Sequence, residues 1–287
     1  MNERTAGWIG WAPLVALPAG ALVAGPGLPR WVFMWVLAGA VFASCKWLTW
    51  WPLRRRATAG RSAGYLLLWP GMDARTFLDP ARKPSSPRGR EWLFAAAKTL
   101  LGVALLFAAS AVSPPLLRGW VGLVGTIFVL HFGTFHFVAL LWRRAGVQAE
   151  PIMRAPILAR SLGDFWGHRW NLGFHNLAHD HIYQRLAPKA GRAAAVIAVF
   201  LASGLVHDLV ISVPAGGGYG LPTAYFALQG LGVFIERSAA GKDFGLGHGI
   251  AGRIFMAAFT AGPAYALFHP TFVREVMLPF MSVLGIK

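Results

Sequence analysis

The sequence predicts an all-α membrane protein, a polytopic bundle of about seven or eight transmembrane helices. Of its 287 residues, 56% are hydrophobic and only 13% are charged. A soluble domain carries about 25% charged residues, so this composition is typical of a chain that lies in a bilayer. Apolar runs separated by basic or glycine- and proline-rich stretches have the length, roughly 17 to 25 residues, that a helix needs to cross about 30 Å of hydrocarbon.

The first two apolar segments form a pair joined by a tight turn. Residues 7–24 and 30–52 are each long enough to span, and the stretch 25–29 between them is rich in glycine and proline. The first segment has one arginine ahead of its apolar run, as a signal peptide does, but Pro13 and Pro18 interrupt the run. We therefore expect it to be a retained membrane helix.

A long basic loop at 53–91 follows. Residues 64–73 within it are apolar but too few to span, so we expect them to lie in the membrane interface or to dip in and return. Spanning helices are expected next at 92–112 and 120–142, because proline and glycine turn the chain between them and two arginines close the second.

The second half of the chain begins with another basic loop, 143–192. A spanning helix is expected at 193–213, where the only ionisable groups are two adjacent residues near its end. A glycine-rich loop ends this helix. Helices at 221–236 and 250–268, followed by a short apolar tail, complete the predicted bundle.

Basic residues concentrate in the two long loops. Loops 53–91 and 143–192 hold nine and eight Lys or Arg residues, whereas the opposite turns 25–30, 113–119 and 214–220 hold two together. Cytoplasmic loops of membrane proteins collect Lys and Arg, so we expect the N-terminus and both long loops on the cytoplasmic side of a plasma or inner membrane. This topology accounts for the net charge of +16, which predicts the lipid bilayer, and no nucleic acid, as partner.

The adjacent ionisable residues of helix 193–213 are His207 and Asp208. A charged group in a membrane helix costs about 2.5–3.5 kcal/mol to insert, so such a residue is a functional candidate by default. Ser203, Gly204 and His207 share one small, polar helix face. Asp208 points about 100° away, so we expect it to pair with an arginine or a backbone donor rather than with His207. The alternative is that His207 only forms a hydrogen bond between helices.

A second candidate is the segment 164–171, where aromatic rings surround a polar set. Irregular or polar backbone is tolerated at membrane depth only where protein encloses it. An interfacial aromatic belt anchored by an arginine is the alternative interpretation. The rings belong to Phe165, Trp166 and Trp170, and the polar residues are Asp164, His168, Arg169 and Asn171.

The pairing of FWGHRWN at 165–171 with SGLVHD at 203–208 resembles the membrane-bound O-acyltransferase superfamily, in its wax-synthase-like branch. The resemblance covers about 150–280 well, and the segments 69–73 and 268–280 also look like that branch. It implies one integral-membrane acyltransferase domain over 1–287, with a buried acyl tunnel.

The same resemblance implies a reaction and residues for it. The reaction is fatty acyl transfer from acyl-CoA to a hydroxyl acceptor, foremost a long-chain alcohol as in wax ester synthesis. By matching position, His207 becomes the catalytic base and Asn171 the second active-site residue. A sterol-like lipid, a diacylglycerol or a sugar stays open as acceptor, as do chain length, an acyl carrier protein as donor, and the oligomeric state.

The chemistry is consistent with those residues. Acyl transfer to an alcohol needs a neutral base near the hydroxyl, a site that excludes water and an oxyanion donor, which an asparagine or tryptophan N–H can supply. Arg160 and Arg169, with Trp166 and Trp170, are the expected binding residues for acyl-CoA as a co-substrate. Positive-inside topology explains the basic residues of this region equally well. We expect no permanently bound cofactor and no metal.

Two other functions remain open. Histidine spacings at 131–136 and 175–181 are reminiscent of a membrane di-iron fatty-acid oxidase, a desaturase or hydroxylase, but no adjacent His-His pair occurs and the single Cys45 offers no thiolate site. The other alternative is a non-catalytic lipid or proton transporter in which His207 relays protons. Transporters usually contain related halves, and the two halves here do not match.

Overall fold

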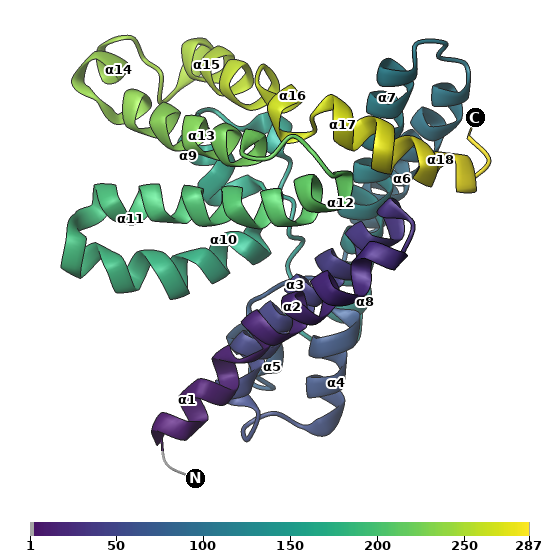
Figure 1. Ribbon diagram of the computed structural model, residues 1–287. Coiled ribbons are helices and arrows are strands. Elements are labelled where there is room, and N and C mark those ends of the chain that lie inside the picture. The colour runs from purple at the N-terminus through teal and green to yellow at the C-terminus, as the bar shows by residue number, and fades with distance from the viewer. Residues whose placement is uncertain (1–2, 287) are drawn as a thin grey trace. The chain divides into compact units, whose positions relative to one another are not determined.

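The computed structural model describes residues 3–286, and throughout that range the chain is helical or irregular, without a β-strand. The all-α prediction is therefore confirmed. The chain folds into two compact units (Figure 1). Unit 1 comprises Met1–Ile152 with Val276–Lys287, and unit 2 comprises Met153–Glu275. The prediction of a single acyltransferase domain stays a prediction.

Six helical segments within the described range are long and apolar enough to cross a membrane, so the protein is an integral membrane protein. The predicted count of seven or eight spans stays a prediction, because Leu221–Arg237 has 17 residues, at the lower limit of spanning length. The six segments are Gly7–Gly27, Arg30–Leu53, Gly89–Ser110, Pro115–Arg144, Leu172–Ala215 and Gly249–Leu267.

The beginning of unit 1 matches the predicted helix pair and short apolar segment. Lys46, in the second helix of that pair, is buried; its ammonium donates to the carbonyl of Gly71 at 2.6 Å and lies 3.1 Å from the ring centroid of Tyr65. These contacts anchor the loop at 69–73 to the helix 30–50. The helices are α1 (Glu3–Trp11), α2 (Pro13–Ala24), α3 (Arg30–Trp50), α4 (Ala59–Leu68) and α5 (Ala74–Leu78), with 3-10 turns at Gly25–Gly27 and Trp51–Leu53.

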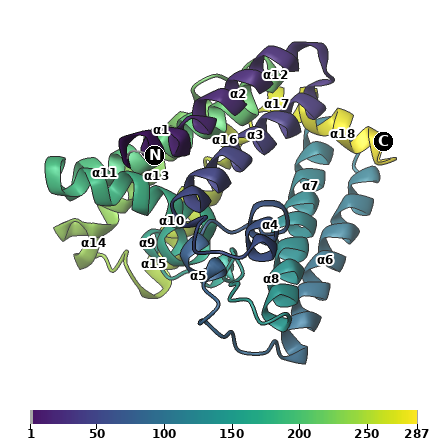
Figure 2. The same ribbon diagram turned by 90° about the horizontal axis from the view of Figure 1, so that it is seen from below.

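The rest of unit 1 is built on α6 (Gly89–Ser110) and a long helix beside it (Figure 2). Both occur where helices were predicted. Glycine lets them approach closely, since a Cβ at Gly102 would stand 2.7 Å from the backbone nitrogen of Val129. The long helix consists of α7 (Pro115–Ile127), a π-helical stretch Phe128–Thr134 and α8 (Phe135–Arg144), and α18 (Leu278–Val283) packs on α7.

Unit 2 corrects one expectation about secondary structure. We expected a loop at 143–192, but residues 172–190 are helical and run back along 192–215 (Figure 1). Gly191, at φ 86°, makes the turn between the two arms. Histidines and basic residues at 172–190 interrupt the helical spacing of apolar residues there, so the sequence did not predict this helix. The first arm comprises α10 (Leu172–Ala178), a π-helical stretch His179–Tyr183 and the start of α11 (Gln184–His207); the second continues α11 through a π-helical stretch Asp208–Ser212 into α12 (Val213–Ala215).

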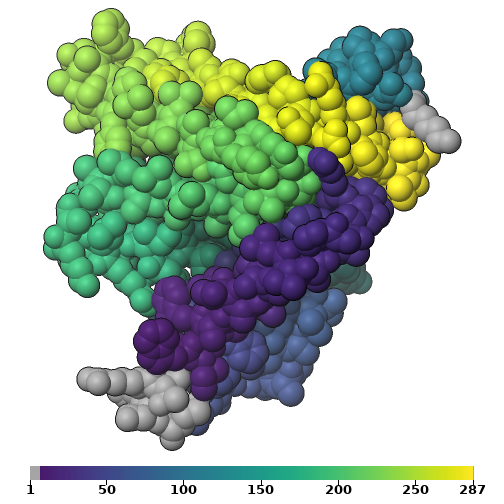
Figure 3. Space-filling view, in the orientation of Figure 1, coloured from purple at the N-terminus to yellow at the C-terminus, as the bar shows by residue number. Residues whose placement is uncertain are grey.

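The helix α13 (Leu221–Arg237) forms where predicted and packs along α11 (Figure 3). A Cβ at Gly204 of α11 would stand 2.7 Å from the Cα of Thr223, so glycine permits this close approach. The predicted helix 250–268 is confirmed with a break at Gly262 and Pro263. The remaining elements are Pro156–Leu158 (3-10), α9 (Leu162–Asp164), Phe165–Arg169 (π-helical), α14 (Ala239–Asp243), α15 (Gly249–Ala261), α16 (Ala264–Leu267), α17 (Pro270–Phe272) and Val273–Met277 (π-helical).

Candidate active site

His207 is the last residue of α11, and its ring has a defined tautomer. Its Nδ1 lies 2.7 Å from the carbonyl oxygen of Ser203, which can only accept, so Nδ1 carries the hydrogen. In the neutral ring the Nε2 lone pair is then available as a base. The half-buried ring lies 4.4 Å from the ring centroid of Phe226, and no group in residues 3–286 forms a hydrogen bond with Nε2.

Asp208 binds the first turn of α13 rather than His207. Its carboxylate accepts from the backbone nitrogens of Gly220 at 2.8 Å and Thr223 at 3.0 Å, and also from the Thr223 hydroxyl. The hydroxyl of Ser212 donates to it at 2.9 Å. This confirms the expectation of backbone donors elsewhere. The first N–H groups of a helix lack internal partners, so Asp208 caps α13 from a neighbouring helix.

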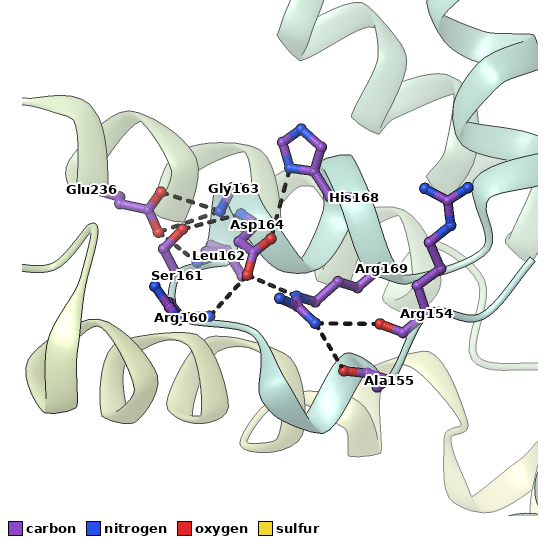
Figure 4. Close-up of polar contacts among 10 residues, drawn as sticks. All are labelled: Arg154, Ala155, Arg160, Ser161, Leu162, Gly163, Asp164, His168, Arg169 and Glu236. Carbon is purple, nitrogen blue, oxygen red and sulfur yellow. Dashed lines mark hydrogen bonds and ion pairs between the residues drawn. The ribbon is translucent and has the colours of Figure 1, made fainter. Parts of the chain in front are cut away.

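Asp164 and Arg169 hold the segment 161–169 together (Figure 4). The Asp164 carboxylate accepts from the backbone nitrogen of Arg160 at 3.1 Å and from Nε of Arg169 at 2.7 Å, and it lies 3.7 Å from Nδ1 of His168. Partial burial raises the pKa of Asp164, but the hydrogen bonds from Arg169 and Arg160 and the charges of Arg169 and His168 outweigh it, so the pKa lies below its usual value.

Arg169 and Arg160, both expected to bind acyl-CoA, differ in their surroundings. The Arg169 guanidinium donates to Asp164 and, at 3.4 Å each, to the carbonyls of Arg154 and Ala155. The guanidinium therefore links the loop before α9, at residues 154–155, to the segment 165–169. The side chain of Arg160 is exposed, and of this residue only the backbone nitrogen donates to Asp164 (Figure 4).

Glu236, in the last turn of α13, binds the backbone at the start of α9, within the segment 161–169. Its buried carboxylate accepts from the backbone nitrogens of Leu162 at 2.5 Å and Gly163 at 3.1 Å (Figure 4). A Cβ at Gly163 would stand 2.9 Å from Oε1, so the glycine makes room for the carboxylate. Sequence reasoning missed Glu236. An acid at the end of an apolar helix was the available signal.

Trp166 joins the segment 164–171 to His207. Its Nε1 donates to Oε1 of Gln229 at 3.2 Å, and Gln229 in turn donates to the carbonyl of Phe259 at 2.7 Å. Its ring lies 5.5 Å from the ring of Phe226, which lies on His207. The two stretches expected to act together are thus brought together by one face of α13. The buried Gln229 was also missed, because nothing in the sequence marks its partner.

Trp170 and Asn171 are the last two residues of the segment 164–171. Trp170 stacks on Phe165 with ring centroids 5.3 Å apart and planes 17° apart. Asn171 has a left-handed backbone, φ 42°, and its Oδ1 accepts from the backbone nitrogen of Phe174 at 3.5 Å, which caps α10. Asparagine tolerates this conformation better than most residues. Because Oδ1 faces the helix, the Nδ2 amide group points away from that cap.

The helical hairpin brings Asn171 and His207 to the same end. Asn171 lies 20 residues before the turn at Gly191 and His207 lies 16 residues after it. In antiparallel arms this offset of four residues corresponds to about 6 Å along the axis. Both predicted catalytic residues therefore lie near the open end of the hairpin.

The histidines of the first arm stack on one another. The ring centroids of His175 and His179 lie 6.1 Å apart, and those of His179 and Tyr183 lie 5.3 Å apart. No group of three or more His, Cys, Asp or Glu side chains within residues 3–286 could hold a metal ion.

These features define a class of protein: a helical integral membrane protein with a histidine at the end of an apolar helix and an aromatic segment packed beside it. Comparison with known proteins relates part of the chain to one family. Residues 149–228 match the membrane bound O-acyl transferase family, and this stretch contains Asn171 and His207. This match covers less than a third of the chain, and it agrees with the family that the sequence resembles.

Curated relatives from Arabidopsis thaliana agree with its wax-synthase-like branch. The chain is 30% identical over 152 residues to "Probable long-chain-alcohol O-fatty-acyltransferase 9", a match of 48% of this chain and 45% of the relative. It is 34% identical over 119 residues to "Probable long-chain-alcohol O-fatty-acyltransferase 3", or 37% and 34% of the two chains. It is 31% identical over 98 residues to "Acyl-CoA--sterol O-acyltransferase 1", or 30% and 28%. The chain thus spans less than half the length of these relatives.

Proposed function

We propose that this protein is a membrane O-acyltransferase that transfers a fatty acyl group from acyl-CoA to a hydroxyl-bearing lipid, foremost a long-chain alcohol. The observation that carries this proposal is the tautomer of His207: Nδ1–H is bound to Ser203, so the neutral ring offers Nε2 as a base. The family match over 149–228 and relatives named for fatty alcohols and a sterol support the reaction class.

In the proposed mechanism His207 acts as general base. Nε2 takes the acceptor's hydroxyl proton as the oxygen attacks the thioester carbonyl carbon, forming a C–O bond and an oxyanion. The intermediate then collapses, the C–S bond breaks, and the leaving thiolate takes the proton back from Nε2. The proton is conserved, and the ester leaves with His207 neutral again.

Asn171 is the proposed oxyanion donor. Its Oδ1 is held by the first turn of α10, which directs the Nδ2 amide outward as a hydrogen-bond donor. Trp166 is less suited to this role, because its N–H donates to Gln229. Removing one oxyanion donor typically costs a factor of about 10²–10³ in rate.

For the donor, we propose that Arg160 contacts the phosphates of acyl-CoA. Its exposed side chain favours it over Arg169, whose guanidinium is bound to Asp164 and two carbonyls. Trp166 and Trp170 then act by shaping the apolar wall beside the thioester. We place the long basic segments on the cytoplasmic side, and a reporter fused at Pro87 that reads as external would overturn this orientation.

The test is ester formation by purified protein in detergent, with long-chain acyl-CoA and a fatty alcohol, a sterol or a diacylglycerol as acceptors. The His207→Ala variant is expected to lose nearly all ester formation per folded molecule. The matched control is His248→Ala, which removes an exposed histidine and is expected to leave the yield unchanged. Wild-type yield from His207→Ala would overturn the assignment, and a preference for sterol would redirect the acceptor.

A further inference from the structure

His269 is a fully buried histidine that the proposed reaction leaves without a role. It lies between α16 and α17, and its Nδ1 accepts from the backbone nitrogen of Phe272 at 3.2 Å. A backbone N–H can only donate, so Nδ1 is unprotonated and the neutral ring carries its hydrogen on Nε2. Nε2 lies 3.3 Å from the hydroxyl oxygen of Ser212 and is the donor there.

Ser212 connects His269 to Asp208 through two hydrogen bonds of its hydroxyl group. Its buried hydroxyl receives the hydrogen of His269 and donates its own to Oδ1 of Asp208 at 2.9 Å. The carbonyl of Gly218 lies 3.3 Å from the same hydroxyl. Gly218 has φ +73°, and a Cβ there would collide with the His269 ring, so a glycine is required for this approach.

Asp208 connects this chain to the proposed base by two routes. Along the backbone it is the residue after His207, at the start of the π-helical stretch Asp208–Ser212. Through space it caps the first turn of α13, and one turn further along α13 the ring of Phe226 lies 4.4 Å from that of His207. A displaced Asp208 therefore moves both the backbone and the ring that set the orientation of His207.

We propose that His269 is a positioning residue for His207, acting through Ser212 and Asp208. The inference rests on the proposed function, because the orientation of His207 matters only if Nε2 receives a proton from substrate. Fully satisfied buried networks of this kind fix one arrangement of the groups around them. Misplacing a reacting group by about 1 Å can cost a factor of about 100 in rate.

The competing explanation is local: His269 could serve only as the N-cap of α17, through its bond from Phe272. Two substitutions separate the roles. The His269→Asn amide oxygen can replace Nδ1 as cap acceptor, but it is too short to reach Ser212. The His269→Gln amide nitrogen can replace Nε2–H as donor to Ser212, while the local cap is lost.

The experiment measures kcat and KM for both variants, with Ser212→Ala as a third, each normalised to folded protein. Positioning through Ser212 predicts a kcat decrease of about 10- to 100-fold in His269→Asn and Ser212→Ala, with KM for acyl-CoA unchanged, and a smaller decrease in His269→Gln. The reverse order, with His269→Gln impaired and His269→Asn near wild type, would overturn the proposal.

A second readout does not depend on activity. Side-chain ¹⁵N spectra of histidine-labelled protein report the tautomer of His207, whose signal is assigned by its loss in His207→Ala. His269→Asn is expected to shift or broaden that signal and His269→Gln to leave it. An unchanged His207 signal in both variants would overturn the positioning role, even if the wild type forms ester. Absent ester formation with the expected spectra would instead count against the proposed function alone.

Discussion

Two carboxylates act at opposite ends of α13, and they cap in opposite directions. Asp208 reaches in from the neighbouring helix and caps the first turn of α13, whereas Glu236 belongs to α13 itself and caps the first turn of α9. The first end supports His207 and the second supports the segment that ends in Asn171. One helix thus sets the positions of both proposed catalytic residues, and each end has its own acid.

The two acids also differ in electrostatic setting. A negative charge at a helix N-terminus is stabilised by the helix dipole, and both carboxylates lie at such an end. Glu236, however, lies in the last turn of its own helix, where a negative charge is unfavourable. Its retention there is explained by the two backbone N–H groups of Leu162 and Gly163 that it binds.

The largest expected effect is at the Asp208 end. Asp208→Ala removes the acceptor of three donors at the start of α13 and of the buried Ser212 hydroxyl, and one unsatisfied buried donor costs about 1–3 kcal/mol. We expect the yield of folded protein and the melting temperature in detergent to fall, with Asp208→Asn in between because one oxygen remains.

The control for Asp208 is Asp243→Ala, which removes an exposed acid in α14. A melting temperature equal to wild type in Asp208→Ala, together with lost ester formation, would contradict the capping role. It would instead mean that the carboxylate acts on the reaction, directly or through the position of His207, and not on the stability of α13.

The sequence predicts the Asp208 end better than the Glu236 end. A histidine and an acid inside an apolar segment stand out by composition alone, and the geometry of a helix separates their directions. The roles of Glu236 and Gln229 depend on hydrogen-bond partners 74 and 63 residues away in the chain. No local sequence pattern predicts contacts over such separations. Most of the membrane-spanning helices could be predicted, because the length of an apolar segment is a local property of the sequence.

The first arm of the hairpin shows a different limit. Its histidines and basic residues predicted a loop, yet it is helical and runs antiparallel to the second arm (Figure 1). The expectation that Arg169 binds acyl-CoA stays a prediction, and the contacts of its guanidinium with Asp164 could not have been read from spacing alone. Five residues separate the two in the chain, which in a π-helical stretch brings them together.

A smaller effect is expected at the Glu236 end. Glu236→Gln keeps one acceptor oxygen but turns an amide group toward the N–H of Leu162 or Gly163, so we expect a loss of about 1–3 kcal/mol in unfolding free energy. The rate of ester formation should fall through the position of Asn171, while the ¹⁵N signal of His207 stays in place. A His207 signal that shifts as it does in Asp208→Ala would show that the two ends of α13 do not act separately.

The smallest effect concerns pH and the Asp164–Arg169 pair, which stabilises the same segment that Glu236 caps. An unfolded aspartate titrates near pH 4, whereas the pKa of Asp164 is held below that value in the folded protein. The folded state therefore gains stability from this group at pH above about 4, and loses it as the pH falls through the folded-state pKa. Because the two side chains are 24% and 25% exposed, the gain should be below about 1 kcal/mol.

Thermal unfolding at pH 7 and pH 3 measures this gain in stability. Asp164→Asn should melt slightly lower than wild type at pH 7, and the difference in melting temperature should shrink at pH 3. An equal difference at both pH values would mean that the hydrogen bonds of Asp164, and not its charge, hold the segment beside the proposed base.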